Sequence, residues 1–542
     1  MRRDLGDFQT PPELAAALVA RLGPIGARWP RVLEPTCGRG AFLEAVCSAL
    51  APPREVVGVE IQSSHGTEAR ARLALLPSPT RSTILEADVF GLDLRTDPPW
   101  TEGGPLLVLG NPPWITNAEL GRLGSANLPP KRNVKSLSGL AARTGAANFD
   151  LGEAVWLKLI DELADQDPTI ALLCKTSVAR AVLHHLHRTG RPVSDAEMIE
   201  IDARRWFGAS VGACFLKLTL GAGGSTGRVA VFSDPEASRP RCAMGSVQGL
   251  FASDLETLET LDFAVGRSPV CWRQGVKHDT ARVLELTERP DGTLCNGLGE
   301  EVVVELSFVY PLLKGTDLAR RAIDRPRRRL IVTQEKLGGE TRDLAERAPL
   351  LWSYLRDRAG WFDKRRSSIY QNAPPFALFG IGPYTFAPYK AAVAGIHRPS
   401  RFRAVGPVDG RPTVFDDTCY LLPCRSALEA AVLAAAADDP IARRVLRALT
   451  FADAKRPVTK AVLQMIDLGG VLARADAPAL IDRVAEILRD DLGLDDGTDD
   501  AIKAEVERLI PLLSPSDDRK LERPASDVVT AESPSASSDR PA

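Results

Sequence analysis

The stretch RVLEPTCGRGAFLEAV, residues 31–46, contains the parts from which we predict the fold. A short apolar strand ends in Glu34, and the apolar spacing of AFLEAV predicts a helix. Between them, Gly38 and Gly40 allow a tight backbone turn and a close approach to a ligand. A strand that passes through a glycine turn into a helix is the repeating unit of an α/β fold.

Further apolar segments of strand length follow along the chain. They are EVVGVE (55–60), TILEAD (83–88), LLVLGN (106–111), TIALLCKT (169–176), GACFLKLTL (212–220) and GRVAVF (227–232). Helical patterns such as EARARLALL (68–76) separate the early ones. Alternating strands and helices build a parallel sheet, so we predict a doubly wound, Rossmann-like α/β domain over residues 1–235.

Polar residues end the first four strands: Glu34, Glu60, Asp88 and Asn111. In an open parallel sheet, ligands bind beyond the carboxyl ends of the strands. We therefore expect these four side chains to line one crevice.

The ligand expected in this crevice is a nucleoside without phosphates. A dinucleotide fingerprint needs a third glycine, and Leu43 stands in its place, which argues against NAD and FAD. Glu60 follows Gly40 by 20 residues, the spacing at which a carboxylate can accept both ribose hydroxyls. Asp88 would accept a hydrogen bond from the adenine amino group. This donor and acceptor set indicates S-adenosylmethionine.

Five motifs carry a family resemblance: FQTP (8–11), EPTCGRGAF, GVEIQ, EADVF and GNPPW. In this order they resemble the class I S-adenosylmethionine-dependent methyltransferases that modify adenine N6 in DNA, of the gamma class. The match covers roughly residues 5–233, and Arg39 departs from the usual small polar residue. The resemblance implies a site-specific methyltransferase of double-stranded DNA, the modification enzyme of a restriction-modification system.

The resemblance also implies the cofactor-binding residues. They are Phe8, Thr10, Pro11, Glu34, Pro35, Cys37, Gly38, Gly40, Glu60, Ile61, Asp88, Val89 and Asn111.

The tetrapeptide Asn111-Pro112-Pro113-Trp114 is the expected catalytic motif. An exocyclic amino group is a poor nucleophile because its lone pair is delocalised into the ring. Acceptors at the Asn111 side chain and the Pro112 carbonyl, held by the rigid Pro-Pro pair, would bind its two N–H groups and free the lone pair. Trp114 would stack on the base, which must leave the duplex. Phe207 is the expected second aromatic, with neighbouring Trp206 as the alternative.

The motif is compatible with three other substrates and with one non-enzymatic function. A cytosine N4, an adenine in RNA or a protein glutamine presents a similar amino or amide group. A DNA-binding defence component without turnover is a non-enzymatic alternative. Methylation of cytosine C5 is unlike this pattern, because the nearest Pro-Cys pair, Pro423-Cys424, lies far down the chain.

Residues 250–515 are expected to form a separate α+β domain for target recognition, after a linker at 233–246. The strands expected there include 301–307, 328–334 and 413–423, and the helices include 426–439 and 477–492. Between residues 311 and 410 there are 19 Lys and Arg against 9 Asp and Glu, an excess that favours a polyanion partner. The expected DNA-binding residues are Lys364, Arg365, Arg366, Tyr384 and Lys390. Residues 516–542 are expected to be a disordered tail.

Composition limits the remaining possibilities. There is no apolar run long enough to cross a membrane and no signal peptide, so a cytoplasmic protein is expected. The nine cysteines show no metal-ligand spacing, and we expect neither disulfides nor a bound metal. We also expect a monomer whose nuclease, if one exists, is a separate chain.

Overall fold

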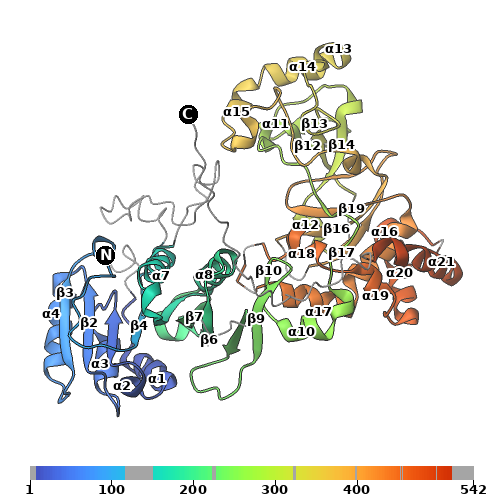
Figure 1. Ribbon diagram of the computed structural model, residues 1–542. Coiled ribbons are helices and arrows are strands. Elements are labelled where there is room, and N and C mark those ends of the chain that lie inside the picture. Colours follow the sequence, from blue (N-terminus) through green and yellow to red (C-terminus); the bar gives the residue numbers. More distant parts are fainter. Residues whose placement is uncertain are drawn as a thin grey trace, which may run out of the picture.

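The computed structural model describes residues 8–115, 150–221, 227–321, 325–396, 400–451, 453–454, 456–495 and 497–514. The expected tail at 516–542 lies outside them. Figure 1 shows an N-terminal part built on one large sheet, coloured blue to green, beside a C-terminal part coloured green to red. None of the described helices is both long and apolar enough to span a membrane.

A ten-stranded sheet organises the N-terminal part, in the order β10-β9-β8-β6-β7-β5-β4-β1-β2-β3. Its strands are β1 (Arg31–Glu34), β2 (Glu55–Glu60), β3 (Arg81–Glu86), β4 (Leu106–Gly110), β5 (Thr169–Lys175), β6 (Val193–Ile201), β7 (Ala213–Leu220), β8 (Arg228–Phe232), β9 (Cys242–Val247) and β10 (Leu250–Ala252). Strands β1 to β5 are parallel, whereas β7 is antiparallel to both of its neighbours. The predicted α/β fold is thereby confirmed, and its sheet is parallel over β1 to β5 but mixed beyond them.

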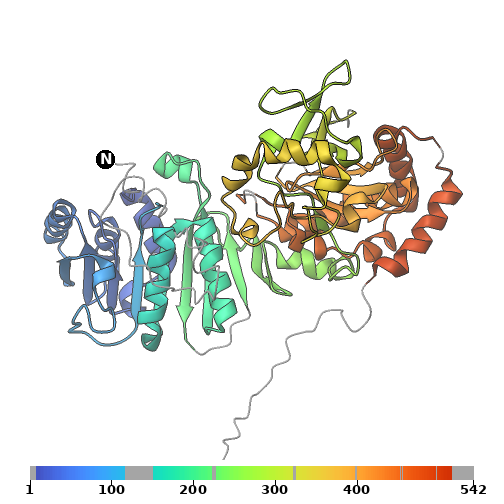
Figure 2. The same cartoon turned by 90° about the horizontal axis from the view of Figure 1, so that it is seen from above.

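Helices cover both faces of this sheet, as Figure 2 shows from above. In β4, Leu107 and Leu109 pack into the core beneath α1, α2, α3 and α4, while Leu106 and Val108 pack into the opposite core beneath α7 and α8. Successive strand residues point to opposite faces, so a continuous apolar run such as LLVL fits a doubly covered sheet. The helices of this part are α1 (Pro12–Leu22), α2 (Ile25–Arg28), α3 (Ala41–Cys47), α4 (Ser63–Ala74), α7 (Leu151–Glu162), α8 (Thr176–Thr189) and α9 (Ala203–Phe207).

The end of the segment expected as a linker, residues 242–246, belongs to the sheet. Cys242 and Met244 are buried in β9, which pairs antiparallel with β8, and β10 pairs with β9 in turn. The sequence did not predict β9 because its side chains are small or contain sulfur. This strand pairs with β8 and covers the edge that β8 would otherwise leave open. The sheet therefore continues to Ala252, beyond the boundary expected at residue 235.

The C-terminal part contains two smaller sheets and is α+β, as predicted. One has the order β11-β19-β16-β17 and the other β13-β12-β15-β14-β18. The strands are β11 (Arg273–Gln274), β12 (Glu285–Glu288), β13 (Leu294–Asn296), β14 (Val309–Leu313), β15 (Arg328–Ile331), β16 (Tyr389–Ala394), β17 (Phe402–Val405), β18 (Val414–Phe415) and β19 (Cys419–Cys424). The segment 301–307 was wrongly predicted as a strand: Val303 is 69% exposed, and a 3-10 turn occupies Leu306–Phe308.

An alanine-rich helix, α16, forms the centre of the C-terminal core. All residues from Ala430 to Ala437 are buried, because α16 packs on β16 and β17 and is covered by α20 and α21. The helices here are α10 (Leu255–Thr260), α11 (Ala281–Leu284), α12 (Gly315–Leu318), α13 (Leu344–Arg347), α14 (Pro349–Arg356), α15 (Ala359–Asp363), α16 (Ala427–Asp438), α17 (Pro440–Leu449), α18 (Lys460–Gln464), α19 (Leu468–Leu472), α20 (Ala477–Leu492) and α21 (Asp499–Leu513).

The two parts are joined by direct contacts. The backbone N–H of Ser253, just after β10, donates to the carbonyl of Ala448 in α17 at 2.8 Å. Asp453 accepts a hydrogen bond from Thr176 at 2.5 Å and forms an ion pair with Arg180 at 2.7 Å, both at the start of α8. The C-terminal part is thus tied to the helix that follows β5.

Candidate active site

The turn after β1 depends on its two glycines. Gly38 has a φ of +52° and Gly40 a φ of +80°, values that other residues adopt only with strain. A β-carbon on Gly40 would lie 3.1 Å from the β-carbon of Ala69 in α4. Glycine at this position therefore allows α4 to lie against the start of α3.

The carboxylate of Glu60 is fixed at the end of β2. Its Oε2 accepts a hydrogen bond from the backbone N–H of Gly38, and its Oε1 accepts one from that of Gln62, both at 2.8 Å. Each carboxylate oxygen has a second lone pair, so Glu60 can still accept hydrogen bonds from ligand hydroxyls. The β1 turn and the start of α4 together orient this acceptor.

Glu34, at the end of β1, is buried beside Glu60. Burial raises the pKa of Glu34 well above its ordinary value, the backbone hydrogen bond from Leu43 opposes this, and the nearby charge of Glu60 adds to it. Within the described part of the chain, neither Glu34 Oε2 nor Thr36 Oγ1 has a hydrogen-bond partner. Buried polar atoms are normally paired, so these two atoms are available to a polar ligand.

Asp88 lies at the rim of the same site and is exposed. Its Oδ1 accepts a hydrogen bond from the backbone N–H of Phe90 at 3.0 Å, which caps the 3-10 turn Val89–Gly91. This contact holds the carboxylate after β3 and leaves its other oxygen for a ligand donor.

The N-terminal segment, residues 8–11, lies against the same site. Gln9 Oε1 accepts a hydrogen bond from the backbone N–H of Arg39 at 3.1 Å, and the carbonyl of Phe8 accepts one from Asn111 Nδ2 at 2.8 Å. The segment therefore contacts both the glycine turn and the end of β4.

The amide of Asn111 has a defined orientation. Because a carbonyl can only accept, the contact with Phe8 requires the Asn111 nitrogen on that side and places Oδ1 on the other. Asn111 Oδ1 is buried and has no hydrogen-bond partner among the described residues. An oriented, unpaired acceptor can bind an N–H group of a substrate.

The hollow at this site brings most of the predicted cofactor residues together. Its lining includes Phe8, Thr10, Glu34, Pro35, Cys37, Gly38, Glu60, Ile61, Asp88, Val89, Asn111 and Pro113. Pro11, Gly40, Pro112 and Trp114 lie outside the lining. The lining residues that the sequence prediction missed are Gln9, Thr36, Ala41, Phe42, Val59, Gln62, His65, Ala87, Phe90, Leu151 and Val155. All of them except His65, Leu151 and Val155 stand inside the quoted motifs, so the motifs themselves were the signal that could have found them.

Three aromatic rings pack together beside Asn111. The ring centroids of Trp114 and Phe207 are 5.0 Å apart in an edge-to-face arrangement, and Phe8 lies 5.5 Å from Trp114 and 6.1 Å from Phe207. Trp114 is 6% exposed, whereas Phe207 and Trp206 are half-buried. The cluster joins the segment that begins at Phe8, the Asn-Pro-Pro-Trp motif and α9.

A bacterial methyltransferase is similar to this chain over most of its length. The chain is 34% identical over 471 residues to the type II methyltransferase M.NspV of Nostoc sp., and the match covers 86% of this chain and 96% of that protein. The chain belongs to the type II methyltransferase family. It is thus a DNA methyltransferase of restriction-modification type that uses S-adenosylmethionine. No family model matches the chain.

Two solved structures are similar to this type II methyltransferase in part. The type IIL restriction-modification enzyme MmeI, in complex with DNA, gives a TM-score of 0.44 at 12% identity, over 89% of this chain and 72% of that one. A methyltransferase subunit of a type I system from Streptococcus thermophilus gives 0.31 at 19% identity, over 42% and 46%. The family assignment depends on the sequence similarity to M.NspV.

The hollow of this type II methyltransferase fits the cofactor by its chemistry. Glu60 offers oriented acceptors for ribose hydroxyls, and Asp88 offers an acceptor for an adenine amino group. The unpaired atoms of Glu34 and Thr36 add polar positions, while Val89 and Leu151 among others provide apolar wall. An acidic lining with few cations suits a cationic sulfonium ligand better than a phosphate.

The predicted DNA-binding residues of this type II methyltransferase have unlike environments. Lys364 and Arg366 are exposed, Tyr384 is half-buried, and Arg365 donates to the carbonyl of Ala377 at 2.8 Å. Lys390 was wrongly predicted as a DNA-binding residue.

Lys390 is 1% exposed and therefore does not lie on the surface. It occupies the interior strand β16, and its Nζ donates to the carbonyl of Ala387 at 2.6 Å. Burial lowers its pKa from 10.5 to about 7. The sequence YKAAVA did not predict the burial of Lys390, because a lysine in a short strand normally points to solvent.

Proposed function

We propose that this methyltransferase modifies adenine N6 in double-stranded DNA, at a site-specific position and on a flipped base. The observation that supports this most directly is Asn111 Oδ1, a buried, oriented acceptor at the edge of an acidic cofactor hollow. S-adenosylmethionine supplies the methyl group. The remaining chemistry belongs to residues of the chain.

The catalytic role of the motif follows from its acceptors. Asn111 Oδ1 and the carbonyl of Pro112 accept the two N–H groups of the target amine and draw it out of conjugation with the ring. The nitrogen lone pair would then form the bond to the methyl carbon while the bond between that carbon and the sulfonium sulfur breaks, and the methylated amine would lose its extra proton to water. Pro112 and Pro113 keep this geometry rigid.

The aromatic cluster is proposed as the platform for the flipped base. Trp114 and Phe207 are in edge-to-face contact. A base that enters the site must therefore either move these two rings apart or lie along their outer surfaces. Stacking on such a face contributes about 1–3 kcal/mol per base. This is enough to offset much of the cost of unstacking the base from the duplex.

The C-terminal part is proposed as the target-recognition domain, and the N-terminal part as the catalytic domain. The excess of basic residues between 311 and 410 supports DNA binding by the C-terminal part. We also propose a monomeric, cytoplasmic modification enzyme whose cognate restriction endonuclease is a separate chain.

The test is incubation of the purified chain with double-stranded DNA and methyl-labelled S-adenosylmethionine, followed by digestion to nucleosides. We expect the label in N6-methyl-2′-deoxyadenosine released from the DNA. Label in N4-methylcytosine would replace adenine by cytosine as the target. Preferential labelling of RNA in a competition assay, or no transfer at all, would refute the proposal.

A further inference from the structure

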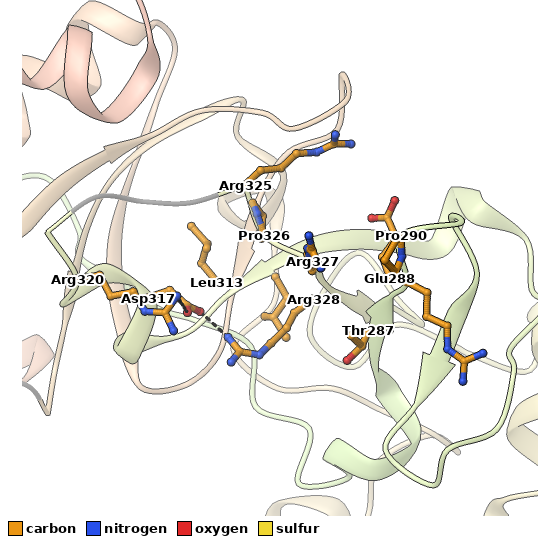
Figure 3. Close-up of a pocket in the computed structure, with 12 residues that line it drawn as sticks. Thr287, Glu288, Pro290, Leu313, Asp317, Arg320, Arg325, Pro326, Arg327 and Arg328 are labelled. Atoms are coloured by element: carbon orange, nitrogen blue, oxygen red, sulfur yellow. Dashed lines mark hydrogen bonds and ion pairs between the residues drawn. The ribbon is translucent and has the colours of Figure 1, made fainter.

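A second hollow, of about 810 Å³, lies in the C-terminal part, far from the cofactor site in the sequence. It is formed by β12 and the turn after it, the end of β14, α12 and the start of β15 (Figure 3). Five arginines line it: Arg289, Arg320, Arg325, Arg327 and Arg328. Its acidic lining residues are Glu288 and Asp317.

Both acidic side chains are already engaged. Asp317 Oδ2 accepts from the backbone N–H of Lys314 at 2.9 Å and pairs with Arg328 at 2.8 Å. Glu288 pairs with the buried Arg329, which is not among the residues that line the hollow. Asp317 also lies 3.9 Å from Arg320, so Arg320 and Arg328 share one carboxylate, and in the described part of the chain no ion pair to Arg289 or Arg327 is formed by either lining carboxylate.

Two arginines carry the clearest excess. Arg289 and Arg327 are exposed, and neither guanidinium donates a hydrogen bond or forms an ion pair within the described residues. Arg325 forms an ion pair with Asp409 at 2.6 Å, and both side chains are more than half exposed. Such an exposed ion pair contributes little free energy, so Arg325 can exchange Asp409 for another anion.

The backbone holds these donors in place. β12 and β15 are antiparallel, with Thr287 opposite Arg328. The N–H of Glu288 donates to the carbonyl of Arg327 at 2.8 Å and extends the pairing by one step. Arg289 and Arg327 thus lie at the adjoining ends of two paired strands, which reduces the entropy lost when they bind together.

We propose that this hollow binds the phosphodiester backbone of the DNA substrate, at a distance from the base being methylated. Its available groups are almost all N–H donors, and a guanidinium matches the paired oxygens of a phosphate. A guanidinium can also donate to the O6 and N7 of guanine, so the dependence of binding on DNA sequence distinguishes base reading from phosphate binding. This inference depends on the proposed function in that double-stranded DNA is the substrate.

The test uses the full chain with Arg289→Gln and Arg327→Gln combined. Each lost phosphate contact removes about 0.9 from the slope of log affinity against log salt. The double variant should therefore lose about 1.8, so that the change in affinity between 50 and 200 mM salt becomes about twelvefold smaller. Binding is measured by fluorescence anisotropy with DNA duplexes of several sequences.

A matched control removes the same two charges elsewhere. Arg267 and Arg489 are exposed and lie outside the hollow lining, so replacing both by Gln should leave the salt slope unchanged. An unchanged slope in the Arg289 and Arg327 variant would overturn the proposal. So would a loss confined to one DNA sequence, which would mean base reading.

This test is separable from that of the proposed function. Salt-dependent binding does not depend on which base is methylated, whereas nucleoside analysis does not depend on this hollow. Cofactor affinity and the thermal unfolding midpoint should match the parent protein in both double variants, which shows that any loss of DNA binding is not a loss of fold.

Discussion

Replacing Asn111 with Ala removes the acceptor on which the proposed chemistry depends. Losing one preorganised polar group that acts in a transition state costs about 2.7–4 kcal/mol, or about 10²–10³ in kcat. We expect a loss of this size. The change also breaks the hydrogen bond between Asn111 Nδ2 and the Phe8 carbonyl, worth about 1 kcal/mol, so cofactor affinity should fall only about fivefold.

The assay for Asn111→Ala is transfer of labelled methyl groups to DNA at saturating cofactor, alongside calorimetric measurement of S-adenosylmethionine binding. The expected result is a large loss of kcat with nearly normal binding. If kcat stays within tenfold of the parent, Asn111 is not the acceptor. If binding and turnover fall by the same factor, its role is to hold Phe8 and the N-terminal segment.

Three further predictions concern the cofactor site and the core. Glu60→Gln places an NH₂ group against one of the backbone donors of Gly38 and Gln62, and should weaken S-adenosylmethionine binding about 10–100-fold by calorimetry. Gly40→Ala should lower the free energy of unfolding in urea by about 1–2 kcal/mol, because its φ of +80° is strained for alanine. Because burial lowers the pKa of Lys390 from 10.5 to about 7, the folded protein binds the lysine proton less tightly than the unfolded chain does. This difference lowers the free energy of unfolding by its full amount below pH 7, and the loss disappears as the pH rises toward 10.5. Lys390→Met should therefore stabilise the protein by about 3 kcal/mol at pH 7, after about 1 kcal/mol for the lost hydrogen bond, and an advantage that persists at pH 10.5 would contradict this.

The sequence was most informative where local pattern and fold agree. The four early strands form as expected, and Glu34, Glu60, Asp88 and Asn111 meet at one edge of the sheet. Parallel strands that are buried on both faces need continuous apolar runs, and their carboxyl ends must lie together. The first consequence follows from burial on both faces and the second from the common direction of the strands.

Contacts between distant segments could not be predicted. The hydrogen bond between Phe8 and Asn111 joins positions 103 residues apart, and nothing in either motif specifies it. The burial of Lys390 depends on strands that flank β16 in space, and it would have required the sheet order. Strand β6 was overlooked because VSDAEMIEI carries acidic side chains along a partly exposed strand.

The extension of the sheet to Ala252 decides how recombinant hybrids of this enzyme should be built. A hybrid joined at residue 235 would lose β9 and β10 and leave the long edge of β8 open to pairing with other chains. A join after Ala252 keeps that edge covered, but Ser253 must still meet a carbonyl equivalent to that of Ala448. Asp453 must likewise keep its partners Thr176 and Arg180. For the C-terminal part as the proposed target-recognition domain, this means exchanging loops within it while the contacts of Ser253 and Asp453 between the two parts are kept.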